Sequence, residues 1–268
     1  MNDLLLTSLI AAAFGLVIGS FLNVCISRLP LDYSVVSPRS HCPRCGAPIS
    51  WYDNIPLLSF LLLLGRCRAC RAPISFRYPL VEFSTALLFF WAWWRTGGGW
   101  PGFKWCFFAA VLVELIFSDA ESRILPDEFT IGGIFAGLAI APVVPVPEGI
   151  LAWLWRMRAP ESSPALESFL HAVFAAALLS GGLWLMGLAY QRVRGREGLG
   201  FGDVKMTAFL GAFLGLETGL LALLAGSLLG SILGILWIKV RGADASTYEL
   251  PFGSFLGVGA LLAAATRL

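Results

Sequence analysis

Two aspartates, Asp119 and Asp203, stand at the ends of apolar segments in settings that suit acid–base chemistry. Asp119 closes one apolar run and is followed by Leu125-Pro126-Asp127, whereas Asp203 lies in the glycine-rich stretch 198–205. Two acids at the same depth in a low-dielectric setting can share one proton. One carboxylate can then activate water while the acid form polarises a peptide carbonyl, which is the chemistry of an aspartic protease.

Each aspartate also has a simpler interpretation, because acids at the ends of spans are commonly solvated or cap helices. Asp127 illustrates it: an acid that opens a helix after a proline is favoured by the helix dipole. Gly198, Gly200 and Gly202 favour the catalytic interpretation of Asp203, since glycines permit close backbone approach and unusual dihedral angles. Their G-x-G-x-G spacing, with no preceding strand, is not a dinucleotide fingerprint.

Four cysteines form two C-x-x-C pairs, Cys42 with Cys45 and Cys67 with Cys70, and Ala-Pro-Ile-Ser follows each pair. This spacing is close to a paired-knuckle zinc pattern. Four thiolates close the tetrahedral shell of zinc, so such a site would be structural. Iron–sulfur or redox chemistry and unliganded thiols remain alternatives, whereas disulfides do not suit the reducing cytoplasm.

Composition predicts an all-α polytopic membrane protein. The chain has 268 residues, of which 57% are hydrophobic and 13% charged, and a mean hydropathy of +0.78. Soluble domains average about 25% charged residues. Apolar runs of roughly 17 to 25 residues recur, and each can cross about 30 Å of hydrocarbon.

The apolar runs predict about eight transmembrane helices, and the N-terminal run is interpreted as a retained span because no basic region precedes it. The predicted spans are 4–26, 79–95, 104–119, 128–146, 168–190, 203–216, 218–238 and 251–266. The predicted domains are a first transmembrane helix (1–26), a cytoplasmic four-cysteine zinc-knuckle loop (27–78) and a seven-helix membrane core (79–268). The segment 147–167 is expected to lie in a membrane interface.

The distribution of Lys and Arg predicts the orientation. Most of the 19 basic residues fall on one side if the N-terminus faces outward. The loop 27–78 and both aspartates then lie on the cytoplasmic side of the inner membrane. The lipid bilayer is therefore an expected partner, and nucleic acid is not.

Five motifs together resemble the bacterial type IV prepilin peptidases, in the order of that family. They are Gly19-Ser20-Phe21-Leu22-Asn23-Val24 with Arg28-Leu29-Pro30, the paired C-x-x-C loop, Tyr78-Pro79-Leu80-Val81-Glu82, Asp119 with Leu125-Pro126-Asp127, and GxGxGDxK at 198–205. The cysteine loop separates this resemblance from preflagellin peptidases and presenilins, which share the GxGD aspartate.

The resemblance implies an enzyme that cuts the basic leader from type IV prepilins and type II secretion pseudopilins at the cytoplasmic face. It also implies N-methylation of the new N-terminus with S-adenosylmethionine, whose site is not readable from the sequence. Asp119 and Asp203 take the catalytic positions. The expected supporting residues are Asp127, Glu121, Gly200, Gly202 and Lys205. Many members have Asp where this chain has Glu121.

Charge sign makes exposed acids the candidates for recognising a basic leader, namely Asp32, Asp53, Glu121, Asp127 and Glu128. Glu82 lies in a family motif and is a further candidate for the site or for methylation. Glu114 and His171 are expected to be structural. Lys205 is expected to reach the membrane interface.

Two other functions compete with the peptidase. A transporter or channel could use paired acids as a proton or metal relay, but such sites lie near the membrane midplane. A non-enzymatic assembly factor with a zinc loop would leave the motifs around Asp119 and Asp203 unexplained. The oligomeric state is not predicted.

Overall fold

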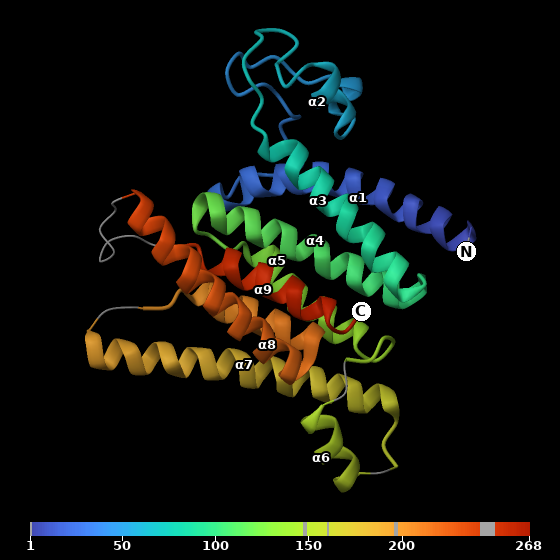
Figure 1. The fold of residues 1–268 in the computed structure, drawn as a ribbon, viewed down its shortest axis with the longest axis vertical. Coiled ribbons are helices and arrows are strands. Elements are labelled where there is room, and N and C mark those ends of the chain that lie inside the picture. The colour runs from blue at the N-terminus through green and yellow to red at the C-terminus, as the bar shows by residue number, and fades with distance from the viewer. Residues whose placement is uncertain (1, 147–148, 160, 196–197, 242–249) are drawn as a thin grey trace. The chain divides into compact units, whose positions relative to one another are not determined.

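The computed structural model describes residues 2–146, 149–159, 161–195, 198–241 and 250–268, and these fold almost entirely into helices (Figure 1). This confirms the predicted all-α class. The helices are α1 (Asn2–Arg28), η1 (Leu29–Leu31), η2 (Trp51–Asn54), α2 (Leu58–Leu62), α3 (Arg77–Thr96), α4 (Gly99–Ser122), α5 (Asp127–Ile140), α6 (Ile150–Arg158), α7 (Pro164–Arg194), α8 (Phe201–Arg241) and α9 (Phe252–Ala265). The chain forms two compact units, 1–117 and 118–268.

In the first unit, α1 packs closely against α3 through a small-residue motif. A Cβ on Gly15 would lie 2.7 Å from Cα of Ala86, and a Cβ on Gly19 would lie 2.7 Å from Cα of Glu82. Small residues four apart allow two membrane helices to approach backbone to backbone. The N-terminal motif at Gly19 therefore has a packing role, and it places the start of α3 beside α1.

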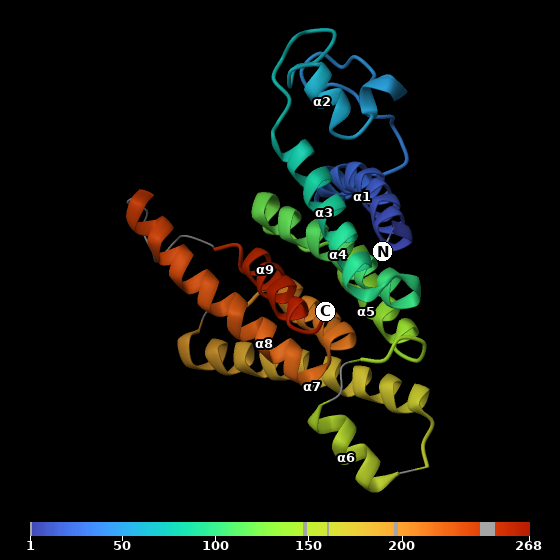
Figure 2. The ribbon, with the colours of Figure 1, turned by 45° about the vertical axis from the view of Figure 1, so that its right-hand side comes forward.

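In the second unit, α8 packs against α5, α7 and α9 (Figures 1 and 2). A Cβ on Gly211 would lie 2.6 Å from Cα of Ala176 on α7. A Cβ on Gly226 would lie 2.7 Å from Cα of Leu256 on α9. Small residues again permit the close approach of helix backbones.

The interruption that the sequence predicted near residue 217 lies at Gly215. This residue has φ 75° and ψ −177°, a non-helical conformation inside α8. Only glycine adopts that region without a large steric cost. The helix therefore consists of two stretches, 201–214 and 216–241.

The predicted number of eight spans is not confirmed. Among the described residues, three helical segments are long and apolar enough to cross a membrane: Asp3–Leu31, Pro164–Arg194 and Phe201–Leu236. The helices α5 and α9 have 14 residues each, which corresponds to about 21 Å at 1.5 Å per residue. The prediction for 128–146 was therefore too long, since α5 ends at Ile140.

The segment expected in an interface, 147–167, contains the short helix α6, while residues 147–148 and 160 lie outside the described part of the chain. Arg156 in α6 pairs with Glu167 in α7 at 2.8 Å. The α6 helix thus packs on the start of α7.

Candidate active site and metal centre

Asp119 lies in the last turn of α4, where the chain reverses toward α5. Arg123 has a left-handed φ of 61° and its Nη1 donates to the carbonyl oxygens of Asp119 (3.0 Å) and Ala120 (2.9 Å). Ser118 Oγ donates to the carbonyl of Ile124 at 2.9 Å. The backbone N of Arg123 also donates to the Asp119 carbonyl at 3.0 Å, so these bonds together fix the turn that carries Asp119.

The Asp119 carboxylate is only 5% exposed and is held by the last helix of the chain. Its Oδ2 accepts hydrogen bonds from the backbone N of Ser254 (2.6 Å) and from Ser254 Oγ (2.8 Å). Sequence reasoning missed Ser254. Its place at the start of an apolar helix, after Pro251, is visible in the sequence but names no partner.

One leucine side chain connects the surroundings of the two aspartates. A Cβ on Gly253 would lie 3.1 Å from Asp119 Cγ and also 3.1 Å from Leu125 Cδ1. A Cβ on Gly202, next to Asp203, would lie 3.3 Å from Leu125 Cβ. Leu125 is buried. It therefore packs between the glycine that faces Asp119 and the glycine that precedes Asp203.

Asp203 lies in the first turn of α8, and its backbone N donates to the carbonyl of Gly200 at 3.2 Å. The charge of Asp119 acts on the Asp203 carboxyl group. The structure thus brings together, within one unit, two acids that are 84 positions apart in sequence. Asp119 is buried and Asp203 is partly buried, a setting in which two acids can share one proton.

The glycines before Asp203 leave room for neighbouring side chains, and they do not adopt unusual dihedral angles. None of Gly198, Gly200 and Gly202 has a positive φ, so that part of the prediction was wrong. A Cβ on Gly198 would lie 2.4 Å from the ring of Tyr190, and Gly202 faces Leu125. A Cβ on Gly200 would meet Asp203 Oδ2 at 3.4 Å, an ordinary contact.

The structure joins two of the predicted supporting residues. Lys205 Nζ forms an ion pair with Asp127 Oδ1 and lies 5.6 Å from the ring centre of Phe201. Lys205 therefore connects the start of α8 to the start of α5. Glu121 is exposed.

Adding one methyl group at Gly253 is expected to displace Asp119. The new Cβ would press on Asp119 Cγ and Leu125, and a misplacement of about 1 Å can cost up to about 10²-fold in rate. Gly253→Ala should therefore lower kcat/KM for the reaction that uses Asp119 by roughly 10-fold or more. Gly132→Ala is the matched control, because a Cβ there has no atom within 4 Å. Equal activity of the two variants would contradict this placement.

The two cysteine pairs fold as a structural repeat in the loop between α1 and α3. The backbone N of Cys42 donates to Ala47 O (2.9 Å), and that of Cys67 donates to Ala72 O (2.8 Å). An antiparallel bridge closes each turn, His41 with Pro48 and Arg66 with Pro73. The repeated Ala-Pro-Ile-Ser sequence therefore reflects two turns of the same hydrogen-bonding pattern.

The four sulfur atoms have the spacing of a tetrahedral metal site. All four lie within 4.8 Å of one another, and Cys42 Sγ is 3.8 Å from Cys70 Sγ. Zn–S bonds of about 2.3 Å in a tetrahedron place sulfurs about 3.8 Å apart. Without a metal, the backbone N–H groups of Cys45 and then Arg44 lower the pKa of Cys42 to about 6, whereas the neighbouring thiols raise the pKa of Cys45 to about 11. Thiolates are the form that binds zinc, so the match rests on the sulfur geometry. The donor set therefore fits zinc.

The repeat also identifies a strained position. Gly46 and Arg71 are equivalent in the two turns and have φ of 71° and 59°. A left-handed conformation costs an L-residue about 1–2 kcal/mol. Arg71→Gly is expected to raise the stability of the loop by about 1 kcal/mol, and Gly46→Ala to lower it similarly. Thermal unfolding of the metal-loaded protein measures both, and a loss of stability in Arg71→Gly would refute the equivalence.

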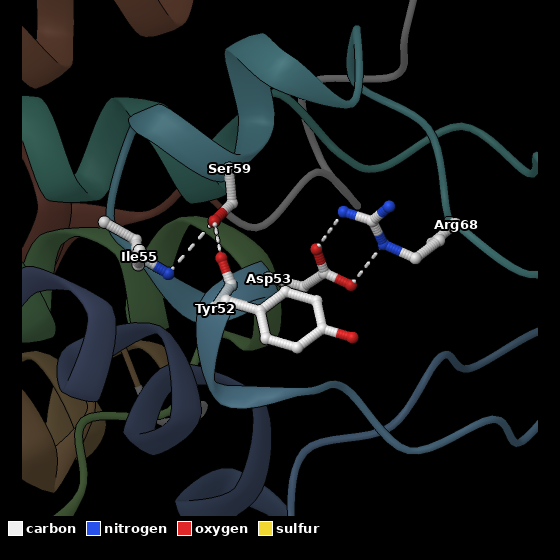
Figure 3. A network of polar contacts seen from close by, with 5 residues as sticks. All are labelled: Tyr52, Asp53, Ile55, Ser59 and Arg68. Atoms are coloured by element: carbon white, nitrogen blue, oxygen red, sulfur yellow. Dashed lines mark hydrogen bonds and ion pairs between the residues drawn. The ribbon is translucent and has the colours of Figure 1, made fainter.

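Asp53 is engaged inside the loop domain. Its carboxylate receives two hydrogen bonds from Arg68, 2.7 Å from Nε and 2.6 Å from Nη2 (Figure 3). The Arg68 hydrogen bonds lower the pKa of Asp53. This pairing leaves Asp53 poorly suited to bind a basic leader, whereas Asp32 and Glu128 are exposed.

The remaining candidates from the sequence, Glu82, Glu114 and His171, are all buried. Glu82 is buried, and its Oε2 accepts from the backbone N of Leu57 at 2.8 Å. Glu114 is fully buried on α4. His171 is buried on α7, with its ring 3.5 Å from where a Cβ on Gly215 would lie.

Comparison with known proteins identifies the family. The model of the bacterial peptidase A24 N-terminal domain matches residues 13–96, and that of the type IV leader peptidase family matches residues 106–235. A prepilin leader peptidase/N-methyltransferase of Pseudomonas aeruginosa is 33% identical over 272 residues, covering 93% of this chain and 87% of the relative. The chain belongs to the prepilin leader peptidase family.

Other prepilin leader peptidase/N-methyltransferases give the same result. That of Aeromonas salmonicida is 36% identical over 278 residues, with 93% of this chain and 87% of the relative covered. That of Myxococcus xanthus is 43% identical over 198 residues, or 74% of this chain, and this chain spans about half (53%) of that relative. No solved structure matches.

Proposed function

We propose that this chain is an aspartic endopeptidase that removes the basic leader from type IV prepilins and type II secretion pseudopilins. The reaction takes place at the cytoplasmic face of the bacterial inner membrane. The observation that carries the proposal is the convergence of Asp119 and Asp203 in one unit of a prepilin leader peptidase. The transporter alternative gains no support from the matching families, which are peptidases.

In this proposal the aspartate pair supplies both halves of acid–base catalysis. One carboxylate removes a proton from water while the other, as an acid, polarises the scissile carbonyl. The two hydrogen bonds from Ser254 fix Oδ2 of Asp119, which orients its carboxyl group. Because interacting carboxylates titrate as a pair, the shared proton belongs to both.

The proposal includes N-methylation of the new N-terminus, which the names of the relatives support. S-adenosylmethionine would supply the methyl group. Zinc would be held by Cys42, Cys45, Cys67 and Cys70 and would cross-link the loop domain. The Lys205–Asp127 ion pair would keep the starts of α8 and α5 in register beside the acids.

The test is to incubate the purified protein in detergent with a prepilin and isotope-labelled S-adenosylmethionine. Mass spectrometry should show the mature pilin without its leader and with one added methyl group. Leader removal without methylation would restrict the function to the peptidase. A prepilin that stays intact would refute the proposal.

A further inference from the structure

The short helix α2 has its polar residue inside and its leucines outside. Ser59 is 7% exposed, whereas Leu61 and Leu62 are 67% and 73% exposed. Helices on soluble domains show the opposite arrangement, because their apolar side chains pack on the core. An exposed apolar cluster of this kind marks an interaction surface.

Polar contacts fix this inverted orientation (Figure 3). Ser59 Oγ donates to the carbonyl of Tyr52 at 2.9 Å and accepts from the backbone N of Ile55 at 3.0 Å. The neighbouring Asp53–Arg68 pair restrains the same segment. Ser59 therefore binds α2 to the loop domain on the inner side of the helix. The leucines on its other side point away from the loop domain.

The start of α2 is fastened to α3. Leu57 has φ 58° and ψ −47°, and Leu58 N donates to Pro56 O at 2.6 Å, which is a strained type of γ-turn. The buried Glu82 of α3 accepts from Leu57 N. A strained backbone persists only where its surroundings hold it, so Glu82 is a positioning residue for α2.

An aromatic contact makes the apolar surface of α2 continuous with that of α3. The rings of Phe60 and Phe76 meet edge to face, with centroids 6.3 Å apart. Beyond Phe76, the exposed flank of α3 continues through Leu80, Phe83 and Leu87. The helix α3 packs along α1, which lies in a segment long and apolar enough to cross a membrane. An exposed apolar flank beside such a segment suits contact with lipid, so the leucines of α2 extend a surface of this kind.

The sequence around α2 has the charge pattern of an interfacial segment. Residues 55–64 contain no charged side chain and are followed by Arg66, while Arg68 is already paired with Asp53. An apolar run of about ten residues is too short to span a bilayer but suits an interface. Arginines beside such a segment are attracted by the anionic lipids of the cytoplasmic leaflet.

We propose that α2 and the residues that follow it are a membrane anchor for the four-cysteine domain. In this proposal Leu58, Leu61, Leu62 and Leu64 insert at the headgroup boundary of the adjacent leaflet. Apolar faces of interfacial helices enter that boundary by about 5–10 Å. The occupant of the exposed surface is thus lipid, and the contact holds the metal-binding loop against the bilayer.

The test places a fluorescent non-natural amino acid at Leu62 or Leu64 in the full-length protein, reconstituted in phosphatidylcholine/phosphatidylglycerol nanodiscs. Val36 is the control position, because it is as exposed as Leu64 (85%) but lies outside the apolar stretch 55–64. Lipids with a spin label near the headgroups should quench the probe at Leu62 and Leu64 several-fold more than at Val36. Equal quenching would overturn the proposal. A probe at Leu62 that is shielded only after a prepilin is added would overturn it in favour of substrate docking.

The attachment through Glu82 is tested in the same nanodiscs. Glu82→Ala removes the acceptor for Leu57 N and should reduce the lipid quenching at Leu62. Glu82→Gln keeps an acceptor oxygen and should restore it. Identical quenching in the two variants would overturn the positioning role of Glu82.

Discussion

Asp119→Asn and Asp203→Asn are each expected to abolish leader cleavage, with kcat/KM lowered by at least about 10³-fold. Asparagine keeps the size of the side chain, and it can accept from Ser254 as Asp119 does. It can neither remove a proton from water nor share one with the other acid. Mass spectrometry of prepilin processing by the purified variants measures the loss.

The control for the aspartate pair is an exposed acid that is distant in sequence from both aspartates. Glu161 lies in the connection between α6 and α7 and is exposed, so Glu161→Gln should retain cleavage. Prepilin binding should persist in both aspartate variants, which separates lost chemistry from lost folding. Full cleavage by either variant would remove that aspartate from the proposed mechanism.

Removing two of the four cysteines is expected to unfold the loop domain while the helices of the second unit persist. Cys42→Ser with Cys67→Ser takes one ligand from each turn. Zinc sites of this type contribute about 10–16 kcal/mol in small peptides, so the loop has little else to replace it. Bound zinc and the hydrogen-exchange protection of residues 40–75 should both fall.

Cys106→Ser is the matched control for the metal site. Cys106 is buried on α4, where its Sγ lies 3.8 Å from the carbonyl of Phe89, outside the four-cysteine cluster. This variant should keep its zinc and the exchange protection of the loop. Undiminished zinc in the double variant would show that the cluster is not the metal site.

Local features of the fold were readable from the sequence because they depend on neighbouring residues. The repeated Cys-x-x-Cys and Ala-Pro-Ile-Ser segments predicted two similar turns, and the structure has them. The helix that opens at Asp127 also follows from local chemistry, since Pro126 precedes it and an acid occupies its first turn. Gly215 was close to a predicted interruption.

Long-range contacts were not readable in the same way. Ser254 binds Asp119 across 135 positions, and no local pattern marks a serine at a helix start as a partner of a distant acid. The pairing of Lys205 with Asp127 depends on how α8 meets α5. Span lengths were overestimated where apolar residues continue beyond a helix end, as they do after Ile140.

The short helices of the second unit bear on how water reaches the acids. Helices α5 and α9 measure about 21 Å, and the first stretch of α8 stops at Gly215. If these helices cross the membrane, as the proposed topology requires, a bilayer with about 30 Å of hydrocarbon would thin around them. All three begin beside Asp119 and Asp203, at Asp127, Phe252 and Phe201. In the proposed peptidase such thinning would bring the headgroups and their water down to the carboxylates, so the hydrolytic water would come from the membrane surface itself.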